Sequence, residues 1–222
     1  MRSTEEIIHR VGKANVITTC DCRNSYWQIP IRPEDTWLTA FVMDFGVFEW
    51  LRAPFALKWS GNSLLRAMQS ILTPLRDFSD SYVDDTSVFS DDWKSHMTDL
   101  KTFLLAIINA KLTLNLNKCH FGRPQVSFVG HIIGSGYHSP DPQKVKAVEQ
   151  IKEPHTKSDL RKIIGFFSYF CAYLPNFARF VRPLTDLTCN NRPNTLDWTE
   201  EHKRILEALK QVLCDATKLH VA

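Results

Sequence analysis

Hydrophobic and polar positions alternate along the first part of the chain in short runs. Runs that are rich in β-branched and aromatic residues and bounded by turn formers predict strands. These runs are residues 16–20, 26–31, 39–43, 47–51, 81–83, 86–89, 112–116 and 126–129. Asp44-Phe45-Gly46 lies between two of the runs and predicts a hairpin turn.

Two longer segments between these strands carry apolar residues at the helical spacing. Residues 60–72 place Leu64-Leu65, Met68 and Ile71-Leu72 on one face, and Pro74 ends the pattern because proline cannot continue a helix. Residues 93–110 repeat the same spacing. This part of the chain therefore predicts a domain of mixed helices and strands.

The pattern changes near Ser139-Pro140-Asp141-Pro142, and from there only helices are predicted. One covers residues 144–151, and a second begins at Thr156, which is followed by Asp159 in a sequence typical of a helix cap. The last opens at Thr199, where two glutamates suit the positive end of the helix dipole. The fold class predicted is α+β, with a helical second domain.

Composition and charge narrow the classes of protein. Hydrophobic residues make up 44% of the 222 residues and charged residues 23%, which is typical of a globular chain. The net charge of +3 permits nucleic-acid binding without requiring it. We find no apolar leader and no apolar run of about 20 residues. We therefore expect an intracellular protein, cytoplasmic or nuclear, that is not secreted and has no membrane partner.

The six cysteines contain no C-x-x-C pair, so we expect free thiols, several of them buried. Cys119-His120 lacks partners at zinc-ligand spacing, and we expect no zinc there.

Asp84 and Asp85 stand side by side between two short predicted strands. Two adjacent carboxylates repel each other unless a cation is present, and Mg²⁺ prefers carboxylate and phosphate oxygens. A two-metal site needs a further carboxylate from a neighbouring strand, and Asp21, at the end of the first predicted strand, is the natural candidate. Paired aspartates are also common in ordinary turns, so the pair alone is a weak signal.

Several other segments occur in the same order as the motifs of a known family. They are Ser25-Tyr26-Trp27-Gln28-Ile29-Pro30-Ile31, Thr39-Ala40-Phe41, Pro54-Phe55, Tyr82-Val83-Asp84-Asp85, Lys118-Cys119-His120-Phe121-Gly122, Val129-Gly130-His131, Leu174-Pro175-Asn176-Phe177 and Trp198-Thr199-Glu200-Glu201. The chain resembles the reverse transcriptase of Ty3/gypsy-type LTR retrotransposons over nearly its whole length. The resemblance implies a palm, which is an antiparallel sheet backed by helices, with part of the fingers in residues 1–138. A helical thumb and connection would occupy residues 139–222.

The resemblance implies an RNA-directed DNA polymerase that transfers nucleotides from dNTPs to a primer on an RNA or DNA template. Asp21, Asp84 and Asp85 would hold two Mg²⁺ ions, for which Mn²⁺ can substitute, and the backbone carbonyl of Cys22 would add a ligand. Lys118 matches the lysine that protonates the pyrophosphate leaving group. A surface lysine that is simply solvated is an equally good interpretation of Lys118.

The same resemblance implies a nucleotide pocket. Tyr26 stands where the family has its aromatic gate against a ribose 2′-OH, and Phe55 and Ala56 lie in the loop beside the incoming nucleotide. Without the resemblance, Tyr26 would be taken for a core aromatic. Phe128-Val129-Gly130 resembles the hairpin that grips the primer end. Six basic residues in the second half would follow the duplex backbone, although lysines on helix faces are usually just solvated: Lys144, Lys146, Lys152, Lys157, Arg161 and Lys162.

This chain departs from the family pattern in three places, of which the mildest is Ser25, where the family usually has glycine or alanine. Only about twenty residues precede Asp21, so most of the fingers are missing, and Ala56 replaces a glycine in an altered loop at 56–61. The alternative to an active polymerase is therefore an inactive remnant that at most binds primer–template. A helical interaction module is a third and weaker hypothesis. Other Pol domains or a second chain are possible partners.

Overall fold

The computed structural model describes residues 4–191, 193–216 and 219–220, the last two by their backbone alone. Contacts divide the chain into two compact units. The first unit contains the chain up to Val129 together with Ile133–Gly136. The second contains Gly130–Ile132 and Tyr137–His220 and is called the helical unit below.

The first unit is built on a four-stranded antiparallel sheet. Its strands are β1 (Val16–Asp21), β4 (Ser79–Tyr82), β5 (Asp85–Ser90) and β6 (His120–Arg123), in the order β4-β5-β1-β6. Strand β1 pairs with β5 from Val16↔Ser90 to Asp21↔Asp85. Strands β4 and β5 form a hairpin, so β5 lies between β4 and β1.

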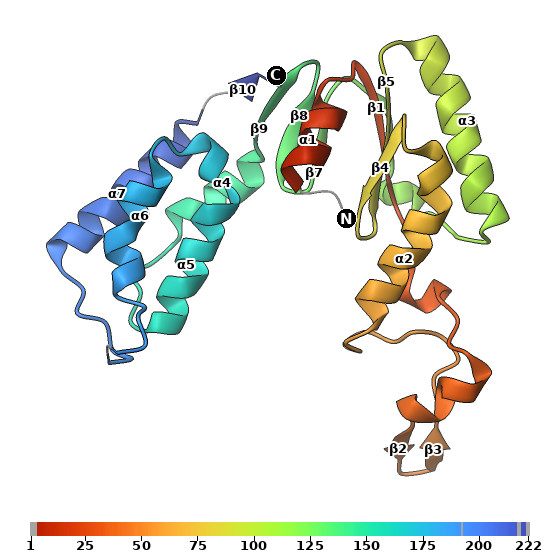
Figure 1. Ribbon diagram of the computed structural model, residues 1–222, viewed down its shortest axis with the longest axis horizontal. Helices are drawn as coiled ribbons and strands as arrows, with labels where there is room; N and C mark the ends of the chain where they lie inside the picture. The colour runs from red at the N-terminus through yellow and green to blue at the C-terminus, as the bar shows by residue number, and fades with distance from the viewer. Residues whose placement is uncertain (1–3, 192, 217–218, 221–222) are drawn as a thin grey trace. The chain divides into compact units, whose positions relative to one another are not determined.

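Helices α2 (Ser60–Leu72) and α3 (Trp93–Asn109) both pack on one face of this sheet (Figure 1). Because side chains alternate across a strand, Cys20 and Val88 face these helices and join a core with the buried Met68 and Phe103. The opposite face presents Ile17 and Phe89, which pack in a second core with helix α1 (Thr4–Gly12). The ends of α2 and α3 agree with the sequence prediction to within one residue.

A chain of hydrogen bonds runs through the buried side of the sheet. Ser90 donates to the Asp99 carboxylate (2.8 Å), so the Nδ1–H of His96 must donate to Ser90 (3.2 Å). Nε2 of His96 then accepts from Thr18 (2.7 Å), whose oxygen in turn accepts from the Gly122 amide. Burial lowers the pKa of His96, which favours this neutral ring. The network ties α3 to β1, β5 and β6 without leaving His96 unpaired.

The segment between β1 and α2 is mostly exposed or half-buried. It contains two 3₁₀ helices, Ser25–Gln28 and Pro33–Thr39, and the small hairpin of β2 (Phe41–Met43) and β3 (Gly46–Phe48). Every residue from 41 to 52 is exposed, aromatic side chains included. The predicted strand at 26–31 is wrong, because Ser25–Gln28 closes into a 3₁₀ turn.

A second sheet, in the order β10-β9-β8-β7, is made mainly from the part of the chain that leads into the helical unit. Its strands are β7 (Val126–Phe128), β8 (His131–Gly134), β9 (Tyr137–Pro140) and β10 (Leu219–His220). The predicted strand at 112–116 is wrong, since Leu114 makes only an isolated bridge to Cys22 and a 3₁₀ turn at Leu116–Lys118 follows.

The helical unit packs α4 (Pro142–Glu149), α5 (Lys157–Tyr169), α6 (Phe177–Asp186) and α7 (Glu200–Cys214) around one apolar core. Its most buried members are Val148, Leu160, Phe167, Phe170, Leu184, Leu206 and Leu213. The sequence pattern did not predict α6, because Pro183 lies inside it. Antiparallel sheets with separate helices confirm the predicted α+β class.

In the part of the chain that the structure describes, no helix is long and apolar enough to cross a membrane. All six cysteines are free, and Cys20, Cys22 and Cys119 are buried, as predicted.

We expect limited proteolysis to begin in the β2–β3 hairpin. A two-stranded sheet without a covered face is marginally stable, and Val42, Phe45 and Val47 are each more than two-thirds exposed. Chymotrypsin at low ratio should therefore cut first between residues 41 and 51, as judged by mass spectrometry of the fragments. A first cut beside the fully buried Phe103 or Phe167 would contradict this order of local stability.

Candidate functional site

Asp21 lies at the last position of β1, directly opposite Asp85 on β5. Directly opposed residues on an antiparallel pair have Cβ atoms about 4.5–5.5 Å apart, and like charges in that position are destabilising. Asp21 and Asp85 lie on the sheet face that α1 covers farther along, at Ile17 and Phe89. The register thus brings together two residues that are 64 positions apart in the chain.

Asp84 lies in the two-residue turn between β4 and β5. The other turn residue, Val83, has φ +59°, a left-handed conformation that is costly for a β-branched side chain. Such strain persists only where surrounding structure enforces it, and it is common at functional sites. Here the flanking pairs Tyr82↔Asp85 and Ser81↔Thr86 enforce it.

The three carboxylates share one electrostatic environment. The pKa of Asp85 is raised by partial burial and by the negative charges of Asp84 and Asp21. The positive charge of Lys118 lowers it. Cys22, buried in the core below, has its pKa raised to about 11 by burial and by the same three aspartates. Its thiol is therefore protonated at neutral pH, and only its backbone carbonyl is available as the ligand that the sequence suggested.

Lys118 is the positive charge that contacts this group. Its Nζ lies 3.2 Å from Oδ2 of Asp21, and its side chain is 63% exposed. The 3₁₀ turn that carries Lys118 is fixed to β1, because the Asn115 amide donates to the Asp21 carbonyl (2.9 Å). The structure therefore brings Lys118 together with Asp21, as an ion pair that solvent still reaches.

The donor set has the chemistry that a divalent cation requires. Asp21, Asp84 and Asp85 supply oxygen ligands of the kind that Mg²⁺ prefers, and their mutual repulsion would be relieved by added positive charge. Among the described residues, no three His, Cys, Asp or Glu side chains already converge closely enough to form a metal site.

The predicted nucleotide-pocket residues lie near one another. Tyr26 is half-buried and meets Phe55 edge to face, with ring centroids 5.3 Å apart. Phe55 also lies 6.1 Å from Trp27 and is 59% exposed. Ala56 has φ +68°, a conformation that suits glycine and strains a residue with a Cβ. The backbone there keeps the shape of a glycine loop although the glycine is absent.

Sequence reasoning missed Gln28. Its side chain donates to the Thr113 carbonyl (3.0 Å) and accepts from the Thr113 amide (2.6 Å), so it acts like a strand partner for the segment before Lys118. The Arg23 amide donates to the same carbonyl (2.9 Å). No local pattern signals this pairing, because the partners are 85 residues apart.

Beside this region lies a cavity of about 590 Å³. Its lining includes Arg32, Asp35, Leu38, Leu57 and Trp59, together with Ser60 and Ser63 of α2.

We expect Asp85→Asn to flatten the pH dependence of stability. The raised pKa means that folded chain binds this proton more tightly than unfolded chain, so the free energy of unfolding falls as pH rises from the ordinary value of 3.8 through the raised value. The substitution removes that loss and should raise Tm at pH 7 by about 1–2 °C without divalent cations. Thermal unfolding between pH 3.5 and 7 measures both effects, with the exposed Asp91→Asn as control. Identical slopes in the two variants would contradict the assignment.

We expect Ala56→Gly to stabilise the chain by about 0.5–1 kcal/mol. Removal of the Cβ relieves the left-handed strain, and the greater freedom of glycine in the unfolded chain offsets part of the gain. Urea unfolding gives the difference. The matched change Ala53→Gly, at a buried position without positive φ, should destabilise instead. A loss of stability in Ala56→Gly equal to that in Ala53→Gly would disprove strain at Ala56.

Curated relatives of this chain are polyproteins of transposons and viruses. The chain is 32% identical over 218 residues to the retrovirus-related Pol polyprotein from transposon opus of Drosophila melanogaster, covering 93% of this chain and 22% of that protein. It is 31% identical over 188 residues to the corresponding polyprotein from transposon gypsy of the same fly (84% and 18%). It is 28% identical over 214 residues to the Pro-Pol polyprotein of Simian foamy virus type 1 (96% and 18%). The chain thus spans about a fifth of the length of these relatives.

Solved structures share the fold. The foamy viral protease-reverse transcriptase in complex with RNA/DNA hybrid is 25% identical, with a TM-score of 0.86 over 99% of this chain and 30% of that one. The same viral enzyme in a dRH form with double-stranded DNA is 24% identical, with a TM-score of 0.89 over 99% and 39%. This likeness supports the predicted fold.

A family model described as reverse transcriptase (RNA-dependent DNA polymerase) matches residues 1–133, which is more than half of the chain. The transposon relatives confirm the predicted resemblance to gypsy-type Pol proteins. The chain therefore belongs to the reverse transcriptase family.

Proposed function

We propose that this chain carries the polymerase site of a Pol protein and adds nucleotides from dNTPs to a primer 3′-OH on an RNA or DNA template. The observation that carries the proposal is the direct pairing of Asp21 with Asp85, next to Asp84 in a strained turn. A structural turn gains nothing from opposing like charges, whereas a site for phosphoryl transfer needs them.

Asp21, Asp84 and Asp85 would hold two Mg²⁺ ions, with the Cys22 carbonyl as a further ligand and Mn²⁺ as a substitute. The bound ions would supply Lewis acidity and bring the primer oxygen and the phosphates together. Lys118 holds a proton on Nζ at the edge of this group and is the candidate donor to the departing pyrophosphate.

Tyr26, Phe55 and Ala56 would form the side of the site that contacts the incoming nucleotide. The Tyr26 ring, which contacts Phe55, would limit the space beside a sugar. The left-handed backbone at Ala56 turns the loop as a glycine would, at the cost of strain. These features support a nucleotide pocket that is present in outline.

We propose that residues 1–138 act as palm with part of the fingers, and residues 139–222 as thumb and connection. Six basic residues were expected to follow the duplex backbone, and their environments differ. Lys157 is buried with its Nζ on the Cys189 carbonyl (2.5 Å), Arg161 donates to the Thr188 carbonyl (2.8 Å), and Lys162 pairs with Asp159. The exposed lysines on or next to α4 remain for phosphate contacts: Lys144, Lys146 and Lys152.

The second candidate function is duplex binding without catalysis. The exposed segment at 41–52 and the strained Ala56 favour it, because a loose fingers region would hold a nucleotide poorly.

Primer extension tests the polymerase proposal. The parent chain should extend a labelled DNA primer on poly-RNA with Mg²⁺ or Mn²⁺, and Asp84→Asn/Asp85→Asn should reduce the rate by on the order of 10³-fold. The exposed Asp91→Asn is the matched control and should keep the parent rate.

If the parent binds RNA–DNA hybrid in a salt-dependent manner but extends no primer, the duplex-binding alternative replaces the polymerase proposal. Equal rates in the parent and the double variant would reject the three aspartates as the site.

A further inference from the structure

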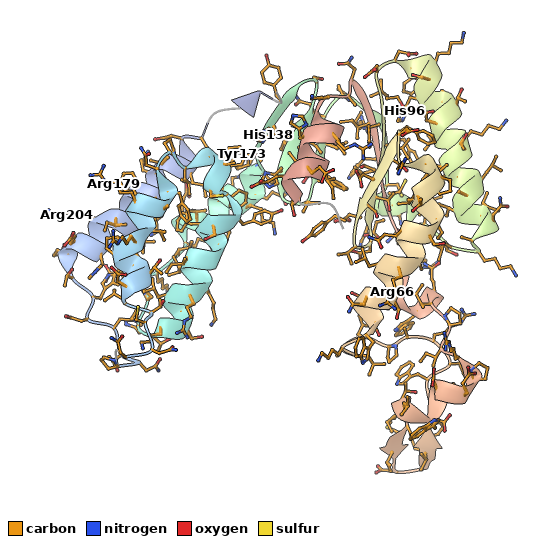
Figure 2. All side chains as sticks on the ribbon, viewed as in Figure 1. Arg66, His96, His138, Tyr173, Arg179 and Arg204 are labelled. Carbon is orange, nitrogen blue, oxygen red and sulfur yellow. The ribbon has the colours of Figure 1, made fainter. Side chains whose placement is uncertain are left out.

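Three polar side chains meet inside the helical unit. The hydroxyl of Tyr173 lies 2.9 Å from Nδ1 of His131 and 2.6 Å from Nδ1 of His138. His131 and Tyr173 are buried, and Figure 2 shows Tyr173 and His138 beside each other. The His131 ring also stacks on the Tyr173 ring, with centroids 5.7 Å apart. We call these three residues the tyrosine–histidine hub.

The hub has a definite order of donors and acceptors. A tyrosine hydroxyl carries one proton, so it can donate to only one of the two histidine nitrogens. The other histidine must present an N–H at Nδ1 and donate to the phenol oxygen. Burial lowers the pKa of His131 to about 4, so its ring is neutral at neutral pH. The hydroxyl of Tyr173 and the neutral His131 ring therefore have hydrogen-bond partners within the hub.

His131 directly follows a tight turn at the end of the β7–β8 hairpin. The two turn residues, Val129 and Gly130, have φ of +48° and +74°, as in the two-residue turns that best fit twisted strands. The helical unit contacts this turn at two further points. The Asp141 amide donates to the Gly130 carbonyl (3.1 Å), and the Tyr169 ring lies 3.4 Å from where a Cβ on Gly130 would be.

These contacts explain why the chain changes unit at this turn. Phe128 is buried in the core of the first unit, whereas Gly130–Ile132 belong to the helical unit. Gly130 and His131 are therefore held by contacts within the helical unit. An apolar core would pack as well without two buried polar side chains and a half-buried one, and a buried polar group is costly unless it is paired. Directional hydrogen bonds add one thing that apolar packing lacks, which is a unique position for His131.

We propose that Tyr173 is a positioning residue that holds the tip of the β7–β8 hairpin, through the tyrosine–histidine hub, in the place needed to grip the primer end. This inference rests on the proposed polymerase function, since it assigns the hairpin the role that the family resemblance implies. Tyr173 acts through His131 and does not contact the nucleic acid itself.

The test compares Tyr173→Phe with the parent. Loss of the hydroxyl leaves the ring in place and should raise KM for primer–template about tenfold, with kcat changed by less than about twofold. Leu187→Ala, in the core of the same unit, is the control for stability. It should lower Tm and leave KM of the folded fraction unchanged. Tyr173→Phe with a lowered Tm but an unchanged KM would overturn the positioning role.

Two further measurements separate a failure of the Tyr173 inference from a failure of the polymerase proposal. ¹⁵N NMR of the histidine rings should show one protonated and one unprotonated Nδ1 among His131 and His138, and Tyr173→Phe should abolish this pattern.

If the parent does not extend primers, the polymerase proposal fails, and the Kd for RNA–DNA hybrid becomes the test of Tyr173. A Kd unchanged by Tyr173→Phe overturns the inference, and absence of hybrid binding by the parent overturns it as well. If Tyr173→Phe does not fold, His138→Gln replaces it with the same expected direction.

Discussion

The antiparallel pairing of β1 with β5 is the contact on which the rest of the first unit depends. It places Cys20 and Val88 toward α2 and α3, and Ile17 and Phe89 toward α1, so that one ladder organises both cores. The same register ends with Asp21 opposite Asp85. A slip of one residue would turn every side chain of β1 to the other face and separate the two carboxylates. The stability of the cores therefore also holds the candidate site in register.

Local strain and repulsion concentrate where the ladder ends. Val83 and Ala56 hold left-handed backbone, and Asp85 faces two other aspartates with Lys118 as the contacting cation. Each feature costs stability in the absence of ligand, and a folded core is needed to enforce it. The exposed segment at 41–52 contrasts with this, because it lacks a covering layer and contributes little to either core.

The helical unit holds the Gly130 end of the β7–β8 turn through contacts of its own. Its core is mainly apolar, and the hydroxyl of Tyr173 in it meets the two histidines. Together with the Asp141 amide and the Tyr169 ring, these groups fix Gly130 and His131. A buried polar group whose partners are complete specifies position more sharply than packing alone.

The sequence by itself was sufficient for the α+β class, the family, and helices such as α2 and α3, because apolar spacing and ordered motifs are local. It misplaced the segment at 26–31, where a 3₁₀ turn replaces the predicted strand, and did not reveal α6 because Pro183 lies inside that helix. It named Asp21, Asp84 and Asp85 as candidates but not their pairing. The register of β1 on β5, the Gln28–Thr113 bridge and the tyrosine–histidine hub join residues 35 to 85 positions apart. Only the tertiary structure decided these contacts, because hydrogen bonds between distant segments depend on packing that no local pattern encodes.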